Sequence, residues 1–157
     1  MTAGGTIWVD ADACPVRISD IIARAAHRRE IKAVFVANKA LPVMQSPFIS
    51  LVQVKAGPDV ADAYIAENAA AGDLVITQDI PLASDVFRKG AVVISPRGFV
   101  FTEDNMADQL SKRDLMTELR DTGEITSRTR PLDETTIRKF ASAFEAAVHR
   151  LSQHRKT

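Results

Sequence analysis

Short apolar runs alternate with helical patterns over the first two thirds of the chain. Five runs have the length and composition of buried strands, and they lie at 7–9, 32–38, 50–56, 73–79 and 91–96. Segments with apolar residues at helical spacing lie between most of them, at about 15–29, 59–70 and 81–88. Apolar strands that alternate with helices are typical of a parallel sheet covered on both faces, so the sequence predicts an α/β fold.

The pattern changes after residue 98, where the strand-like runs largely stop. A helix is predicted at 103–120, with Thr102 as its cap, and a polar linker follows at 122–131. The last segment, 133–151, carries an apolar stripe at helical spacing. We therefore expect an α/β domain over residues 1–123, followed at 124–157 by the linker and a C-terminal helix that packs on the same domain.

Composition narrows the class of protein without indicating a function. The 157 residues are 46% hydrophobic, which suffices for a core, and the formal net charge is zero, so no overall attraction to nucleic acid is evident. The single cysteine, Cys14, excludes an internal disulfide, and neither a signal peptide nor an apolar run of membrane-spanning length is visible. We expect a cytoplasmic protein without a membrane partner, in which Cys14 is a small buried residue rather than a nucleophile.

Acidic residues follow the predicted strands in a pattern that suggests chemistry. Asp10 ends the first strand with Asp12 just beyond it, Asp79 ends the fourth, and Asp59 and Asp62 open the helix at 59–70. The carboxyl ends of parallel strands share one edge of the sheet, where ligands bind. Converging carboxylates repel each other unless a cation joins them, and Mg²⁺ or Mn²⁺ held by carboxylates suits phosphodiester hydrolysis. Asp59 is equally consistent with a helix cap.

Basic residues suggest a phosphate-bearing substrate. Arg97 follows the fifth strand and should lie near the same edge, while Arg113 and Arg120 are seven residues apart on one predicted helix and so share a face. Such side chains could contact the phosphates of a nucleic acid. A solvated helix face explains Arg120 equally well.

Several long motifs resemble one protein family. The segments "VDADACPV", "GPDVADAYI", "DLVITQDIPLA", "VISPRGF" and "LSKRDLMTELR" are similar, in this order, to the YaiI/YqxD family of uncharacterised bacterial proteins, and the resemblance covers residues 7–123. That family is similar to PIN-domain nucleases, which act mostly on RNA, so the resemblance implies RNA as the partner. The resemblance implies a PIN-like α/β fold, catalytic and metal-binding roles for Asp10, Asp62 and Asp79, and a bracing role for Thr77.

Two features depart from the families that the chain resembles. A PIN nuclease has a further acidic residue on an early helix, and the candidates here, Asp20 and Glu30, match no motif, so Asp12 or Asp59 would have to substitute. The Gly-Gly-Pro segment of the YaiI/YqxD family is replaced by "SRTRP" at 127–131.

Two other functions stay open at this stage. A strand followed by Asp-x-Asp also opens the haloacid-dehalogenase-like phosphatases, where Asp10 would be the nucleophile and Asp12 the general acid. That class expects a later lysine, for which Lys89 is badly placed, and an adjacent Asp pair, which the sequence lacks. The second alternative is a non-catalytic module that binds RNA or protein on a PIN-like fold. The oligomeric state is left open.

Overall fold

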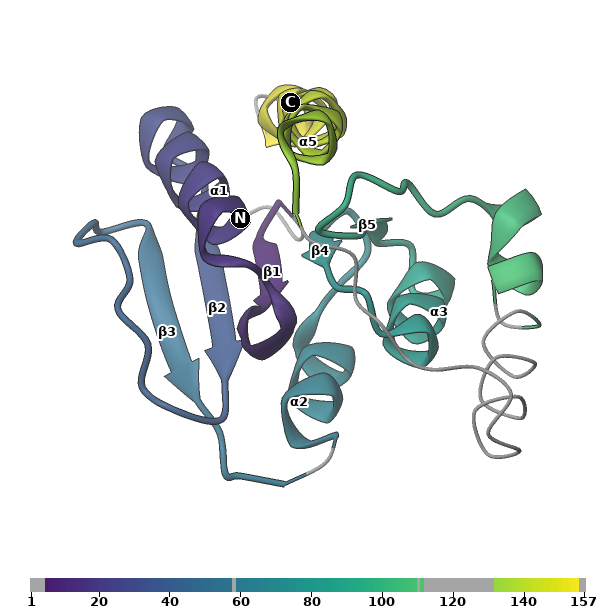
Figure 1. Ribbon diagram of the computed structural model, residues 1–157, viewed down its shortest axis with the longest axis horizontal. Coiled ribbons are helices and arrows are strands. Elements are labelled where there is room, and N and C mark those ends of the chain that lie inside the picture. Colours follow the sequence, from purple (N-terminus) through teal and green to yellow (C-terminus); the bar gives the residue numbers. More distant parts are fainter. Residues whose placement is uncertain (1–4, 58, 110, 112–131, 156–157) are drawn as a thin grey trace.

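A five-stranded parallel sheet forms the centre of the protein. The computed structural model describes residues 5–57, 59–109, 111 and 132–155. The sheet order is β3-β2-β1-β4-β5, and every pair is parallel (Figure 1). The strands are β1 (Ile7–Asp10), β2 (Ala33–Ala37), β3 (Ile49–Gln53), β4 (Leu74–Ile76) and β5 (Val92–Ile94). The predicted α/β fold, a parallel sheet flanked by helices with a C-terminal helical extension, is confirmed.

The helices follow the predicted order. They are α1 (Val16–Arg29), α2 (Val60–Asn68), α3 (Ile80–Arg88) and α5 (Glu134–Arg155), with the 3₁₀ turn η1 (Ala11–Ala13) after β1. Residues 103–109 are also helical; the rest of the helix predicted at 103–120, apart from residue 111, lies outside the described residues, as does the linker predicted at 122–131. None of the helices in the described part of the chain is both long and apolar enough to cross a membrane.

Successive strand residues point to opposite faces and supply two hydrophobic cores. Ile7 and Val9 of β1 face α1 and α5, whereas Trp8 packs with the core beneath α2 and α3. Figure 1 shows α1 and α5 on one face of the sheet and α2 and α3 on the other. Both faces are covered, which is why the inner strands β2 and β4 are apolar at every position rather than alternating.

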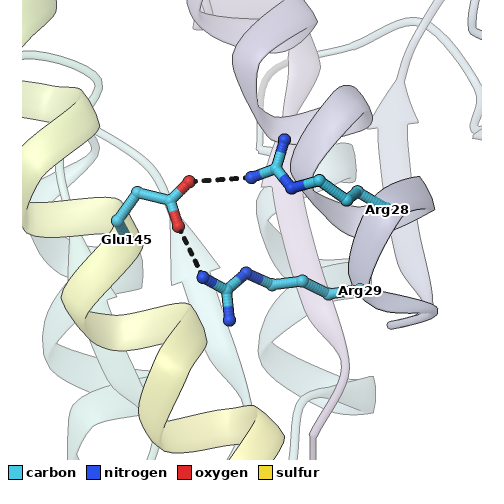
Figure 2. Close-up of polar contacts among 3 residues, drawn as sticks. All are labelled: Arg28, Arg29 and Glu145. Carbon is cyan, nitrogen blue, oxygen red and sulfur yellow. Dashed lines mark hydrogen bonds and ion pairs between the residues drawn. The ribbon is translucent and has the colours of Figure 1, made fainter.

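The C-terminal helix α5 is held mainly by its apolar stripe. Phe140 and Phe144 are fully buried in the core beside α1, and their rings stack with centroids 5.3 Å apart. Glu145 adds ion pairs of 3.1 Å to Arg28 and 2.9 Å to Arg29 at the end of α1 (Figure 2). Partly exposed ion pairs contribute little, so the buried aromatic rings dominate this contact.

Side chains set the ends of several elements. Asp133 accepts a hydrogen bond of 2.8 Å from the backbone N–H of Thr136 and so caps α5. The predicted cap Thr102 is confirmed, because its hydroxyl accepts from the backbone N–H of Asn105 at 3.2 Å. Pro15, predicted as the first residue of a helix, is instead the residue that precedes α1. Its missing N–H and its fixed φ suit either place.

The fourth strand is shorter than the predicted 73–79 because polar side chains take over both ends. The carboxylate of Asp73 accepts from the backbone N–H groups of Thr6 and Ala70 and from the Trp8 ring N–H. Asp79 caps the helix that follows. Asp73 is 3% exposed with three donors satisfied, so its role is structural.

The order of the strands creates a switch point beside β1. The chain runs outward from β1 to β2 and β3, then returns through α2 to β4 on the other side of β1. Connections therefore leave the carboxyl ends of β1 and β4 in opposite directions. In open α/β sheets this is where a crevice forms and ligands bind.

Candidate functional site

Five carboxylates surround one cavity at this switch point. The cavity measures about 370 Å³ and is lined by Asp10, Asp12, Asp59, Asp62 and Asp79. We call it the acidic cavity. Among the described residues, no lysine or arginine side chain lines it. The five acidic residues that the sequence predicted for the site are therefore together, although they come from three separate segments of the chain.

Asp10 lies at the bottom of the acidic cavity, where β1 ends. Its side chain is only 6% exposed, and its Oδ2 accepts a hydrogen bond of 3.1 Å from the Thr77 hydroxyl. Burial raises the pKa of Asp10, the Thr77 hydrogen bond opposes this, and the charges of Asp79 and Asp12 raise it further. The carboxylate is thus fixed in a place that disfavours its negative charge.

Asp79 is positioned by the start of α3. Its Oδ1 accepts from the backbone N–H of Leu82 at 2.8 Å, and its own backbone N–H donates to the Thr77 hydroxyl at 3.0 Å. Thr77, 1% exposed, therefore contacts both Asp10 and Asp79, as the predicted bracing role requires. Side chain and backbone together fix Asp79 at the edge of the sheet.

Asp59, Asp62 and Asp79 form the tightest group. Each offers one carboxylate oxygen, and these three oxygens lie within 4.8 Å of one another. Burial raises the pKa of Asp62 to about 7, with further increases from the charges of Asp79 and Asp10, a hydrogen bond with Asp79, and the charge of Asp59. Asp62 therefore shares a proton with its neighbours near neutral pH unless a positive charge is present.

Asp59 does not cap α2 through its side chain. It precedes the helix in a left-handed conformation with φ of 65°, and it makes no capping hydrogen bond. The cap interpretation is therefore wrong, because the carboxylate lies with Asp62 and Asp79 instead. Aspartate adopts this conformation more readily than most non-glycine residues, and here it places the carboxylate with Asp62 and Asp79.

Asp12 lies at the rim of the acidic cavity and is exposed. Its Oδ2 accepts a hydrogen bond of 2.8 Å from the backbone N–H of Asn38, which follows β2. Asp12 thereby ties η1 to the neighbouring strand. With one oxygen engaged in this bond, Asp12 fits a helper role better than that of a principal ligand.

The donor set of the acidic cavity fits a hard divalent cation. All five acidic side chains offer oxygen atoms only, as Mg²⁺ and Mn²⁺ prefer. The tightest group differs from the predicted Asp10, Asp62 and Asp79 in one member, because Asp59 takes the place of Asp10. Asp10 lines the same cavity, with one of its oxygens held by the Thr77 hydroxyl.

Two amide side chains that the sequence reasoning missed also line the acidic cavity. Asn38 follows β2 directly, and Gln78 lies between Thr77 and Asp79, where its amide donates to the carbonyl of Ala13 at 3.1 Å. Both follow the carboxyl end of a strand. The rule that identified the acidic residues would have identified these two, had it been applied to amides.

Arg97 and Arg113 have different outcomes. Arg97 follows β5 at the carboxyl edge of the sheet, but its charge acts on Asp133 at the start of α5, and it does not line the acidic cavity. Arg113 and Arg120 lie outside the described residues. The phosphate contacts predicted for these side chains therefore stay predictions.

The remaining acidic candidates and Lys89 lie away from the acidic cavity. Asp20 pairs with Arg24 at 3.1 Å along α1, and Glu30 ends the same helix. Lys89, which the phosphatase alternative would need, donates to the carbonyl of Ala66 at 2.9 Å. This contact at the end of α2 disfavours a phosphatase reaction that uses Asp10 as nucleophile.

Cys14 behaves as the predicted structural residue. It is half-buried against the core beneath α1, and burial raises the pKa of its thiol to about 11, with a partly opposing hydrogen bond from Ser19. The thiol is therefore protonated at neutral pH and a weak nucleophile.

Comparisons with known proteins give the chain relatives over nearly its whole length. A family described as "Uncharacterized BCR, YaiI/YqxD family" matches residues 8–150, so the match extends beyond the motifs at 7–123 into α5. A UPF0178 protein of Myxococcus xanthus is 50% identical over 92% of this chain and 95% of its own, and one of Saccharophagus degradans is 46% identical over 90% and 94%. One of Bordetella avium is 49% identical over 92% and 94%.

A search of solved structures gives a weaker likeness. The crystal structure of a mutant of Rae1 (YacP) from Bacillus subtilis is similar with a TM-score of 0.43 and 16% sequence identity. The alignment covers 92% of this chain and 98% of that one.

Proposed function

The chain belongs to the YaiI/YqxD family of uncharacterised bacterial proteins, and we propose that it is a metal-dependent nuclease that hydrolyses phosphodiester bonds in RNA. One observation carries this proposal: five carboxylates from three segments of the chain line a single cavity at the switch point of the sheet. Without a cation, this arrangement raises the pKa of Asp62 to about 7 by burial and charge repulsion. Carboxylates gathered in this way serve to bind a metal or to exchange protons.

The side chains divide into two roles in this proposal. Asp59, Asp62 and Asp79 hold Mg²⁺ or Mn²⁺, which supplies an activated water and offsets charge on the leaving oxygen. Asp10, held by Thr77, orients the water and the phosphate at the bottom of the acidic cavity, and Asp12 assists at its rim. Arg97 and Arg113 contact phosphates that flank the scissile one.

A phosphodiester fits the site better than an ester or amide substrate. Neither His27 nor His149 lines the acidic cavity, and His27 is engaged with the Ser46 hydroxyl at 2.7 Å. The described residues therefore offer no Ser/His or Cys/His pair at the cavity for acyl transfer. RNA is preferred over DNA because the motifs resemble those of PIN-domain nucleases.

Cleavage of a labelled single-stranded RNA in Mn²⁺ tests the proposal. EDTA should stop the reaction, and Asp79→Asn should stop it too. Asp85→Asn is the matched control, because Asp85 is an exposed carboxylate on the same helix that does not line the acidic cavity. Cleavage that persists in Asp79→Asn would indicate a contaminating ribonuclease.

The alternatives give different results in the same experiment. Salt-dependent RNA binding without cleavage of RNA or DNA would support the non-catalytic binding module. A covalent aspartyl-phosphate on Asp10 would support the phosphatase. Arg97→Ala should weaken RNA binding and leave Mn²⁺ affinity unchanged if this arginine contacts phosphate.

A further inference from the structure

A second cavity lies on the other side of η1 from the acidic cavity. It measures about 550 Å³, and it is lined by residues of α1 and of the loop 38–48, which joins β2 to β3 without a helix. Asp12 lines both cavities. Ala13 lines the acidic cavity, whereas Ala11 lines the second one, so one short turn separates them. The two cavities are therefore neighbours that share Asp12 at their border.

The interior of the second cavity is apolar. Leu41, Val43 and Met44 line it from the loop and are half-buried, and Phe35 of β2 lines it from the sheet. Val16 lies at the start of α1 with its side chain 83% exposed, although it lines the same cavity. Apolar walls of this kind suit a flat, weakly hydrated group such as an aromatic ring.

Polar and charged groups are confined to a few positions around these walls. Lys39 lines the second cavity, and no acidic side chain in the described part of the chain forms an ion pair with it. Arg24 and Asp20 also line it and pair with each other at 3.1 Å. An unpaired ammonium group beside an apolar slot suits a ligand that carries both an aromatic ring and a phosphate.

We propose that the second cavity is a base pocket, which holds the nucleobase of the nucleotide adjacent to the phosphate at the acidic cavity. The inference rests on the proposed nuclease function. The faces of the base pack against Leu41, Val43 and Met44, and Lys39 contacts a phosphate of the same strand. A base inside this pocket cannot remain paired in a duplex, so the substrate is single-stranded RNA. The structure thus assigns the substrate class through a cavity whose lining shares only Asp12 with the acidic cavity.

Binding of adenosine 5′-monophosphate, measured by titration calorimetry in EDTA, tests the base pocket without cleavage or metal. Ribose 5-phosphate, which lacks the base, is the matched ligand. Ser19→Phe and Val43→Phe fill the pocket from two different walls, and their melting curves show whether each variant folds. Lys39→Glu tests the phosphate contact, with Lys32→Glu as its control, because Lys32 is exposed at the opposite end of β2.

The inference predicts binding of the nucleotide that depends on its base. Wild type and Lys32→Glu should bind it equally. Both filling variants, which close the pocket to the base, and Lys39→Glu, which removes the phosphate contact, should bind it about tenfold more weakly. Equal affinity for ribose 5-phosphate, or unchanged affinity in both folded filling variants, would overturn the base pocket.

The two proposals can fail separately. A protein that cleaves RNA but binds no mononucleotide retains the nuclease function and loses the base pocket. A protein that binds the nucleotide at this pocket but cleaves no nucleic acid retains the pocket and loses the nuclease function.

Discussion

At the scale of single residues, the Thr77 hydroxyl links two acidic positions that are far apart in the sequence. It donates to Asp10 at 3.1 Å and accepts from the backbone N–H of Asp79 at 3.0 Å. Because Thr77 is 1% exposed, water does not compete for these bonds. The Thr-x-Asp spacing thus has a geometric reason. Thr77, directly after β4, fixes both Asp10 at the end of the neighbouring strand and Asp79 at the start of α3.

The first prediction concerns metal affinity. Asp10→Asn should reduce Mn²⁺ affinity, measured by titration calorimetry, more than Asp12→Asn, because Asp12 is exposed and has one oxygen bonded to the backbone of Asn38. We expect a loss of about tenfold for Asp12→Asn, as for residues that position a ligand. Equal and complete loss in both variants would favour the phosphatase, in which each carboxylate is indispensable.

The second prediction concerns pH. The pKa of Asp62 in the folded protein, about 7, lies above the ordinary value of 3.8, so the folded state binds a proton that the unfolded chain has released. Stability from this group is present below pH 3.8 and is lost as the pH rises to about 7. In EDTA at pH 8, Asp62→Asn should therefore be more stable than wild type and melt at a higher temperature. The gain in free energy of unfolding is about 1–2 kcal/mol after solvent screening is allowed for.

The same variant should show no such advantage at pH 4, where Asp62 is largely protonated in wild type. Mn²⁺ should raise the stability of wild type more than that of Asp62→Asn. In wild type the cation relieves the repulsion between Asp62 and its acidic neighbours, whereas the substitution has already removed that repulsion. If the melting temperatures of both proteins depend on pH in the same way in EDTA, Asp62 is not the group whose pKa is raised in the folded protein.

At the scale of secondary-structure elements, the start of α3 has two functions that substitution can separate. Asp79 caps the helix through its bond from Leu82, and it also belongs to the tight acidic group. Asparagine is a good helix cap but carries no charge. Asp79→Asn should therefore melt at the same temperature as wild type but no longer bind Mn²⁺. Asp79→Ala should also fail to bind Mn²⁺, and it should be less stable by about 1 kcal/mol because the cap is removed.

Calorimetric titration of Mn²⁺ and thermal melting check this prediction together. A large loss of stability in Asp79→Asn would mean that the charge itself, through the helix dipole, matters more than the cap.

The elements were predictable because their apolar runs are buried on both faces. Val34 and Val36 contribute to one core and Phe35 to the other, so the strand is apolar at every position and is easily recognised. The ends of elements were less predictable. Asp73 and Asp79 were assigned to a strand, whereas their side chains bind backbone N–H groups outside it. Local hydrogen bonds of this kind leave no periodic signal.

At the scale of the whole molecule, the acidic residues of the candidate site were predictable, but its two amide side chains and its arrangement were not. Strand ends and the helix at 59–70 indicated the five carboxylates that line the acidic cavity. The sequence could not show that Asp59 joins Asp62 and Asp79, because this depends on a left-handed backbone conformation at Asp59. The second cavity was also unpredictable, since the loop 38–48 that lines it has no regular pattern.

The last prediction concerns how α5 is fixed to the sheet. Gly98 follows β5 with a φ of +89°, and a methyl group added there would lie 2.8 Å from backbone atoms of Lys139 and Phe140 in α5. Gly98→Ala should therefore both strain its own backbone and push α5 away from the core that holds Phe140. We expect a loss of about 2–3 kcal/mol, visible as a fall in Tm of roughly 5–10 °C.

Gly72→Ala separates these two causes. Gly72 has nearly the same φ, 88°, but lies in the turn before β4 rather than against α5, so its substitution reports the backbone strain alone. Gly98→Ala should melt below Gly72→Ala, and the difference measures the contact with α5. Equal melting temperatures would mean that α5 makes room for the added methyl group without a loss of stability. Because α5 packs on the same core as β1, which carries Asp10, a larger fall in Gly98→Ala should be accompanied by weaker Mn²⁺ binding.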